Sequence, residues 1–456
     1  MQKILLFIAS LFYFNFLFSK NEIKSWQGIH ETPLSRLEQQ FAEPPVEFAN
    51  HVIWGWEGKM DKKTICNDLD SIKKKGFRAV IFEAGYKLPF KYLSEEWFKA
   101  IRTGVVEAKK RDMKVWIIDE GKYPSGFAGG KFSQERPDLR MQALVIGDTI
   151  QIKRGEVMTN HKIAPEIISA VAVSTSGAPN RTVEINNGKI SFNAGLDDWK
   201  ILLVKSDFRT AVTRAVNNPN GGKDATNSLC DYLNPVAVQQ FIDWTHKQYK
   251  KYLGKELGTT VLGFRGDEPD YAHLPWTPSI VQTFKDTKGY DPTPYLASFF
   301  TASPTIQEQR VKADYWDVWS SLFATHFFKL QADWCAANGV AHITHLNKEH
   351  EMPACVKAEG DYFRALSKVQ IPGVDAIWNQ IWPSTLNDFP KLASSVAHVY
   401  GKPRAFSESF AAYHISPTIP QAKFVVDHQI ARGINFFEFM FWLAGSKHRN
   451  WKIGRA

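Results

Sequence analysis

The chain alternates between short apolar runs and longer stretches with the periodicity of amphipathic helices. The apolar runs are continuous and several end in acidic residues, which is typical of strands buried on both faces of a parallel sheet. Eight such runs predict strands over residues 48–56, 78–84, 114–120, 261–268, 340–347, 374–380, 404–410 and 434–442.

Helical segments separate most of the predicted strands and have recognisable boundaries. Asp61 is a suitable N-cap, Gly76 ends the same helix, and Pro235 suits the first turn of another. Helices are predicted over residues 61–75, 94–111, 235–257, 313–338, 388–400 and 421–432. Strand-and-helix units repeated eight times predict an α/β fold, the (β/α)8 TIM barrel.

The alternation is interrupted after the third predicted strand. Residues 143–207 are rich in β-forming residues and turn signals. Within them, the turn at 186–188 predicts a hairpin between strands at 183–185 and 189–192. We therefore expect a small β-rich subdomain inserted into the barrel.

The N-terminus has the pattern of a secretory signal. Lys3 precedes an apolar run over residues 4–18, which is short for a membrane span. We expect a signal peptide over 1–20, a periplasmic or secreted protein, and no stable membrane insertion after signal removal. The predicted organisation continues with an N-terminal segment at 21–47, the barrel at 48–142 and 208–456, and the insertion at 143–207.

Composition narrows the class of protein. Hydrophobic residues make up 44% and charged residues 23%, which excludes a disordered chain. Although the net charge is +9, Lys and Arg do not form basic runs, so a nucleic-acid partner is not expected. None of the four cysteines forms a C-x-x-C pair, which argues against zinc-ribbon and thioredoxin folds. Fifteen tryptophans suit flat sugar-binding platforms or a bulky barrel core.

In a TIM barrel, the active site lies at the carboxyl ends of the strands. The residues predicted to line this end are carboxylates, amides and aromatic rings, which together suit the recognition of a sugar. The predicted substrate-binding residues are Trp54, Trp56, Glu83, Asp119, Glu120, Arg265, Asp267, Trp276, His345, Asn347, Asn379 and Gln380.

Two glutamates at strand ends are the candidate catalytic pair. Hydrolysis of a glycosidic bond needs one carboxyl group that protonates the leaving oxygen and another that activates water or attacks directly. Glu268 and Glu408 end the fourth and seventh predicted strands, and we expect them to lie across the barrel mouth from each other. The alternative is that either glutamate forms a structural ion pair with Arg265 or Arg404.

A second constellation has the composition of a metal site. His342, His345 and His350 lie close to Glu349 in the sequence. Because His342 and His345 are three apart on a predicted strand, their side chains point to opposite faces. We therefore favour a sugar-contacting His345 and a core or interface His342, and keep a metal-dependent hydrolase built on His345 and Glu349 as a weaker alternative.

At these residues the chain resembles glycoside hydrolase family 106, the α-L-rhamnosidases. The matching stretches are 119–130, 266–269, 275–277, 333–340 with His345, 371–375, 394–398 and 407–410. The resemblance implies an inverting hydrolase that removes α-linked L-rhamnose from plant-type glycans, often with Ca2+ at the sugar site. It places Glu268 and Glu408 on the catalytic positions, as general acid and general base, although these roles could be exchanged.

Only residues 443–456 follow the last predicted strand, and the family's usual β-sandwich domains are absent from this sequence. Two alternatives therefore stay open besides the rhamnosidase. One is a truncated barrel that binds an oligosaccharide or polysaccharide without cleaving it. The other is a glycosidase of different sugar specificity.

Overall fold

The computed structural model describes residues 33–45, 48–121, 123–210, 213–214, 223–224, 227–269, 271, 274–385, 387–413 and 417–443. Eight parallel strands close into a barrel in the order β1-β17-β16-β15-β14-β12-β3-β2. These strands are β1 (His51–Trp56), β2 (Ala79–Ala84), β3 (Lys114–Ile118), β12 (Val261–Gly266), β14 (Ala341–Thr344), β15 (Ile371–Ala376), β16 (Phe406–Ser409) and β17 (Phe436–Leu443). The predicted barrel is confirmed, and the predicted signal peptide lies outside the described residues.

The barrel interior is apolar, and every strand contributes to it. The cluster comprises Ile53, Ile81, Trp116, Ile118, Leu262, Ala341, Ile343, Ile371, Phe406 and Phe436. A second layer of apolar side chains, including Val52, Val80 and Phe82, packs between the strands and the surrounding helices. Both faces of each strand are thus buried, which explains the continuous apolar runs.

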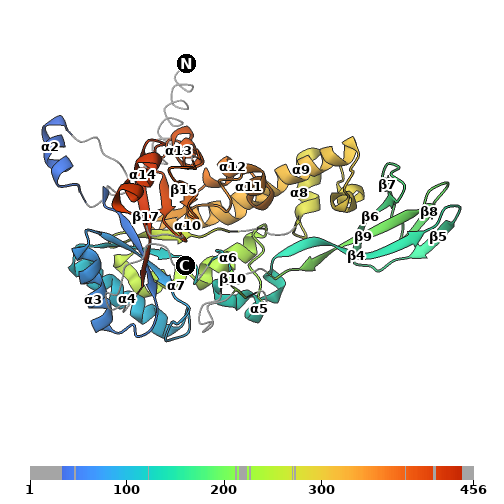
Figure 1. Cartoon of the computed structure of the whole chain (residues 1–456). Coiled ribbons are helices and arrows are strands. Elements are labelled where there is room, and N and C mark those ends of the chain that lie inside the picture. The colour runs from blue at the N-terminus through green and yellow to red at the C-terminus, as the bar shows by residue number, and fades with distance from the viewer. Residues whose placement is uncertain are drawn as a thin grey trace, which may run out of the picture.

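Helices surround the barrel (Figure 1). The helices of the first half are α2 (Leu34–Ala42), α3 (Lys62–Lys74), α4 (Glu95–Lys110), α5 (Lys131–Glu135), α6 (Pro235–Trp244) and α7 (His246–Leu253). Those of the second half are α8 (Ile280–Lys288), α9 (Ile306–Leu322), α10 (Lys329–Ala337), α11 (Met352–Glu359), α12 (Tyr362–Leu366), α13 (Pro390–Val399) and α14 (Ile419–Ile430). Short 3-10 helices are η2 (Ala128–Gly130), η3 (Pro137–Leu139), η4 (Gly254–Glu256) and η5 (Thr293–Phe300), and η6 (Phe323–Phe328) is a π-helix. Among the described residues, no helix has the length and apolar character needed to cross a bilayer.

Two long predicted helices are interrupted. The helix predicted over 235–257 breaks at Thr245, whose hydroxyl donates to the Phe241 carbonyl at 2.7 Å. Such a side-chain bond competes with the helical backbone pattern. The helix predicted over 313–338 begins earlier, at the capping box of Thr305 and Glu308, and passes through η6 before α10.

The insertion after β3 is confirmed as a β-rich unit that projects away from the barrel, toward the right of Figure 1. Its strands are β4 (Gln142–Ile152), β5 (Val157–Lys162), β6 (Ile167–Ser174), β7 (Arg181–Thr182), β8 (Lys189–Asn193) and β9 (Trp199–Phe208). The main sheet has the order β13-β4-β9-β6-β7, in which β13 (Pro275–Trp276) comes from the chain that follows β12. β5 pairs separately with β8, and β10 (Thr213–Arg214) pairs with β11 (Lys223–Asp224).

The predicted hairpin around residues 186–188 is only partly right. The turn exists, because the backbone N–H groups of Asn186 and Lys189 donate to each other's carbonyls at 2.8 and 3.0 Å. However, residues 183–185 form no strand, and β8 pairs with the distant β5. The local turn signal was correct, but the pairing is decided by contacts far apart in the sequence.

Candidate active site

Three acidic side chains lie side by side on adjacent strands. Glu408 of β16 is paired in register with Asp375 of β15 and with Glu438 of β17. Glu408 and Glu438 each follow an interior residue, Phe406 or Phe436, by two positions. Because strand side chains alternate with a period of two, these acids share the interior face and mark the carboxyl end of the barrel.

Arg265 of β12 joins these acids into one buried network. Its guanidinium forms ion pairs with Asp267 at 2.8 Å, with Glu438 at 3.2 Å and with Glu408. The side chain is 0% exposed. Burial alone would lower the pKa of Arg265, but the surrounding carboxylates raise it well above its usual value. The cation is therefore fixed, and it partly balances the negative charge at this end of the barrel.

His345 lies beside Arg265 and links the two candidate catalytic glutamates. Its Nδ1 is 2.9 Å from the Leu346 carbonyl, and its Nε2 is 2.9 Å from Arg265 Nη2. The His345 Nε2 atom is also 3.4 Å from Glu408 Oε2. One ligand atom each from Glu268, His345 and Asp375 lies within 4.8 Å of the others. Both glutamates therefore meet around the same imidazole.

Glu268 has an unusual backbone and an unusual environment. Its φ is 39°, in the left-handed region that costs a residue other than glycine about 1 kcal/mol or more. Burial, reinforced by the charge of Asp267, raises the pKa of Glu268 to about 8. Burial and Glu408 also raise the pKa of Asp375 well above its usual value. A strained acid that holds its proton at neutral pH is suited to donate that proton.

The chain is similar to known glycoside hydrolases. A family model described as alpha-L-rhamnosidase, Glyco_hydro_106, matches residues 161–441, which is more than half of the chain. The chain belongs to this family. It is thus a member of a glycoside hydrolase family, as the sequence resemblance predicted.

Individual relatives are distant and longer. A protein of Formosa agariphila named "Putative beta-glucuronidase" is 23% identical over 92% of this chain. The chain spans only 38% of that relative's length. The solved structure of a rhamnosidase from Novosphingobium sp. PP1Y matches with a TM-score of 0.67 and 15% identity, covering 89% of this chain and 56% of that one. At this identity the structural match supports the fold.

The prediction that three tryptophans stack on the sugar is wrong. Trp54 and Trp56 are 0% exposed and point outward, away from the barrel interior. Trp54 Nε1 donates to Asp68 of α3 at 3.2 Å, and Trp56 packs against Trp97 of α4. Trp276 in β13 is also buried, within the core beside the insertion. These rings hold helices and sheets together and cannot stack on a sugar in this arrangement.

Asp119 and Glu120 were predicted to contact substrate, but both are buried and hold the loop that follows β3. Ser125 Oγ donates to Asp119 at 2.7 Å and accepts from the Asp267 backbone N–H at 2.7 Å. Glu120 accepts backbone N–H groups from Gly121 at 2.6 Å, from Gly129 at 3.0 Å and from Ala128. Burial raises the pKa of Asp119 to about 7 and that of Glu120 to about 8. The glycine-rich loop therefore supports the segment that carries Asp267.

The other predicted contacts lie around the same end of the barrel. Glu83 is buried at the end of β2, and Asn347 is half-buried, with its backbone N–H donating to Glu359 at 3.3 Å. Asn379 and Gln380 are half-buried in the loop after β15, where Gln380 contacts His350 at 3.0 Å. The predicted sixth strand was placed too late, because the structure has β15 at Ile371–Ala376.

That misplacement hid two residues of interest. Asp375 lies at the end of β15 and close to both Glu268 and His345. Trp378, in the loop that follows β15, is an aromatic residue with 53% exposure and φ 55°. The signal was present in the acidic end of 371–376, but Pro372 and Gly373 disfavour a strand locally.

The family resemblance predicted Ca2+, which takes six to eight oxygen ligands. Among the described residues, the two groups near this end of the barrel that could hold a metal are Asp267 with His345 and Glu408, and Glu268 with His345 and Asp375. Each includes an imidazole nitrogen, and Arg265 occupies the space beside Asp267 and Glu408. These donor sets do not fit Ca2+, so calcium binding stays a prediction that chelation can test, and no catalytic step is assigned to it.

Proposed function

We propose that this barrel is an exported, inverting α-L-rhamnosidase that releases rhamnose from plant-type oligosaccharides or polysaccharides. The observation that supports this proposal most is the geometry of Glu268. Its backbone is strained, its pKa is raised to about 8, and its carboxyl group lies near His345, which also contacts Glu408. Family membership supports hydrolysis of a glycosidic bond. The inverting course follows the family resemblance, and export follows the apolar run over residues 4–18.

In the proposed reaction Glu268 is the general acid. Its proton passes to the glycosidic oxygen as the bond from that oxygen to the anomeric carbon breaks. Glu408 is the general base and takes a proton from water, whose oxygen forms the new bond on the opposite face of the sugar. Arg265 contacts Glu408 directly and holds that carboxylate in place. Trp378 is the proposed platform for the sugar or the group attached to it.

The charge near the reacting centre favours a neutral sugar over a uronic acid. The described residues there include the acids Asp267 and Glu408, and the Arg265 guanidinium is already bonded to both of their carboxylates. A glucuronate carboxylate would add another negative charge at this position. Rhamnose has no charge, and the positive charge that develops on the ring would be stabilised by the nearby acids.

Incubation with 4-nitrophenyl α-L-rhamnoside and with rhamnose-containing pectin fragments tests the proposal. We expect wild type to release rhamnose, and NMR at early times should show the β-anomer as the first product. Glu268→Gln and Glu408→Gln should each retain binding and lose turnover on the pectin fragments. Rhamnose binding without release by wild type would instead support the non-catalytic barrel. Faster release from 4-nitrophenyl β-D-glucuronide would contradict the sugar assignment, and loss of all turnover on chelation would favour a metal-dependent mechanism.

A further inference from the structure

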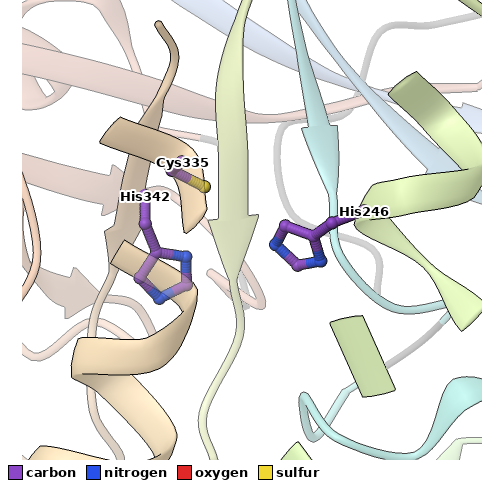
Figure 2. A group of neighbouring side chains, drawn as sticks. All are labelled: His246, Cys335 and His342. Carbon is purple, nitrogen blue, oxygen red and sulfur yellow. The ribbon is translucent and has the colours of Figure 1, made fainter. Parts of the chain in front are cut away.

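Away from the proposed active site, two histidines and a cysteine converge in the core. They are His246 at the start of α7, Cys335 in α10 and His342 in β14, and Figure 2 shows their side chains together. One ligand atom from each lies within 4.8 Å of the others, and all three residues are buried. His342 points outward from the barrel toward the helices, as its alternation with His345 predicted.

The ring nitrogens in this group lack the partners that buried polar atoms normally have. Neither nitrogen of His342 has a hydrogen bond, and Nε2 of His246 has none. Buried polar atoms without partners are rare in folded proteins and call for an explanation. Since one unpartnered nitrogen of each imidazole shares a small volume with a thiol, a single ion bound there would give both rings a partner.

The tautomer of His246 is fixed by its neighbour. The Thr245 hydroxyl donates its hydrogen to the Phe241 carbonyl at 2.7 Å, so its oxygen is left to accept from His246 Nδ1 at 2.9 Å. The proton of this imidazole is therefore on Nδ1, and Nε2 presents a lone pair. An outer partner that orients the imidazole in this way is typical of metal-binding histidines.

We propose that His246, Cys335 and His342 bind one soft metal ion, and that Cu+ is preferred over Zn2+. Bonds of ~2.0–2.3 Å to nitrogen and sulfur place neighbouring ligands ~3.3–4.2 Å apart, so the group needs at most a small contraction. On binding, the Cys335 S–H bond is replaced by an S–metal bond and the proton passes to the solvent. The ion would join two outer helices to a barrel strand.

Charge decides the preference between the two ions. One thiolate and two neutral imidazoles carry a single negative charge, which Cu+ neutralises and Zn2+ overcompensates. Among the described residues no carboxylate belongs to this group, and the walls include the rings of Phe264 and Trp334, 4.2 and 5.3 Å from the His246 ring centroid. A net charge is costly in such surroundings. Three ligands also suit Cu+ better than the four that structural Zn2+ takes.

The test measures metal binding by the full chain. Because Cys66 is only half-buried, a Cys66→Ala background removes a thiol that could bind metal on the surface. One sample of the protein is refolded with excess Cu+ under reducing conditions and another with Zn2+. Each sample is then desalted, and its metal content is measured. We expect one equivalent of Cu+, an X-ray absorption spectrum with one sulfur and two nitrogen ligands, and release of one proton per ion.

Matched variants assign the ligands. Thr245→Val removes the outer partner of His246 and should weaken Cu+ binding by roughly 10–100-fold. Cys335→Ala removes a ligand itself and should weaken Cu+ binding by more than this. Cys355→Ala removes another buried thiol, outside the group, and should change nothing. If Cys335→Ala fails to fold, the wild-type spectrum and Thr245→Val still decide. No bound ion, no sulfur ligand, tighter binding of Zn2+ than Cu+, or equal affinity in Cys335→Ala and Cys355→Ala would overturn the proposal.

Discussion

Replacement of Glu268 by glutamine tests the proposed general acid directly. With a pKa of about 8, Glu268 is about 90% protonated at pH 7, whereas at its ordinary pKa of 4.5 only ~0.3% would be protonated. The surroundings therefore raise the acid form about 300-fold at neutral pH. Glutamine keeps the shape but cannot donate this proton, so we expect kcat/KM on a rhamnosyl disaccharide to fall by about 10²–10⁴-fold.

The pH profile supplies the sharper measurement. In wild type, kcat/KM should fall about tenfold per pH unit above pH 8, as Glu268 loses its proton. Glu268→Gln should lack this alkaline decline. The loss of activity should also be smaller on 4-nitrophenyl α-L-rhamnoside, because nitrophenolate leaves without protonation. Glu256→Gln serves as the control, since Glu256 pairs with Lys109 of α4 at 2.9 Å.

Two results would refute this reasoning. An alkaline decline that persists unchanged in Glu268→Gln would show that another group controls it. An equal loss of activity on both substrates would show that Glu268 does not protonate the leaving oxygen. If Glu408→Gln instead gave the leaving-group dependence, the two glutamates would have exchanged roles.

Three further outcomes are expected. Arg265→Met should lose turnover and about 3–5 kcal/mol of unfolding free energy in urea titrations, because buried carboxylates lose their partner; unchanged stability would contradict the network. Trp54→Ala should lower the unfolding free energy by about 3–5 kcal/mol in the same titrations and leave KM unchanged. Trp378→Ala should instead raise KM with little loss of unfolding free energy. The reverse pattern would contradict the burial of Trp54 and the exposure of Trp378. Because burial raises the pKa of Glu120 to about 8, folding favours its protonated form, and this contribution to the unfolding free energy is lost as the pH rises from 4.5 to about 8. Glu120→Gln should reduce the slope of unfolding free energy against pH in this range by up to about 1.4 kcal/mol per pH unit. An unaltered slope would contradict the raised pKa of Glu120.

The barrel could be predicted because burial on both faces makes its strands stand out as apolar runs. The same property hid the direction of individual side chains. In β1, Ile53 points inward while Trp54 and Trp56 point outward, yet all three are fully buried or nearly so. A half-exposed strand would have shown this by alternating polar residues, and no such signal exists in a strand covered on both sides.

The candidate site was predictable where a carboxylate lies at the end of a predicted strand, as at Glu268 and Glu408. It was missed at Asp375, because Pro372 and Gly373 interrupt the run that leads to it. The sequence offered an ion pair between Glu408 and Arg265 as an alternative, but it did not indicate that Asp267 and Glu438 join the same network. Glu408 and Glu438 come from strands far from β12 in the chain, and only closure of the barrel brings them to Arg265.

The segment that carries Glu268 is held at both ends. Before it lies β12 of the barrel, and after it β13 pairs with β4 of the projecting sheet. The inserted sheet is consequently one of the two anchors of Glu268, the proposed proton donor. Exchange of this sheet between homologues should therefore alter turnover, even where no residue of the barrel is changed.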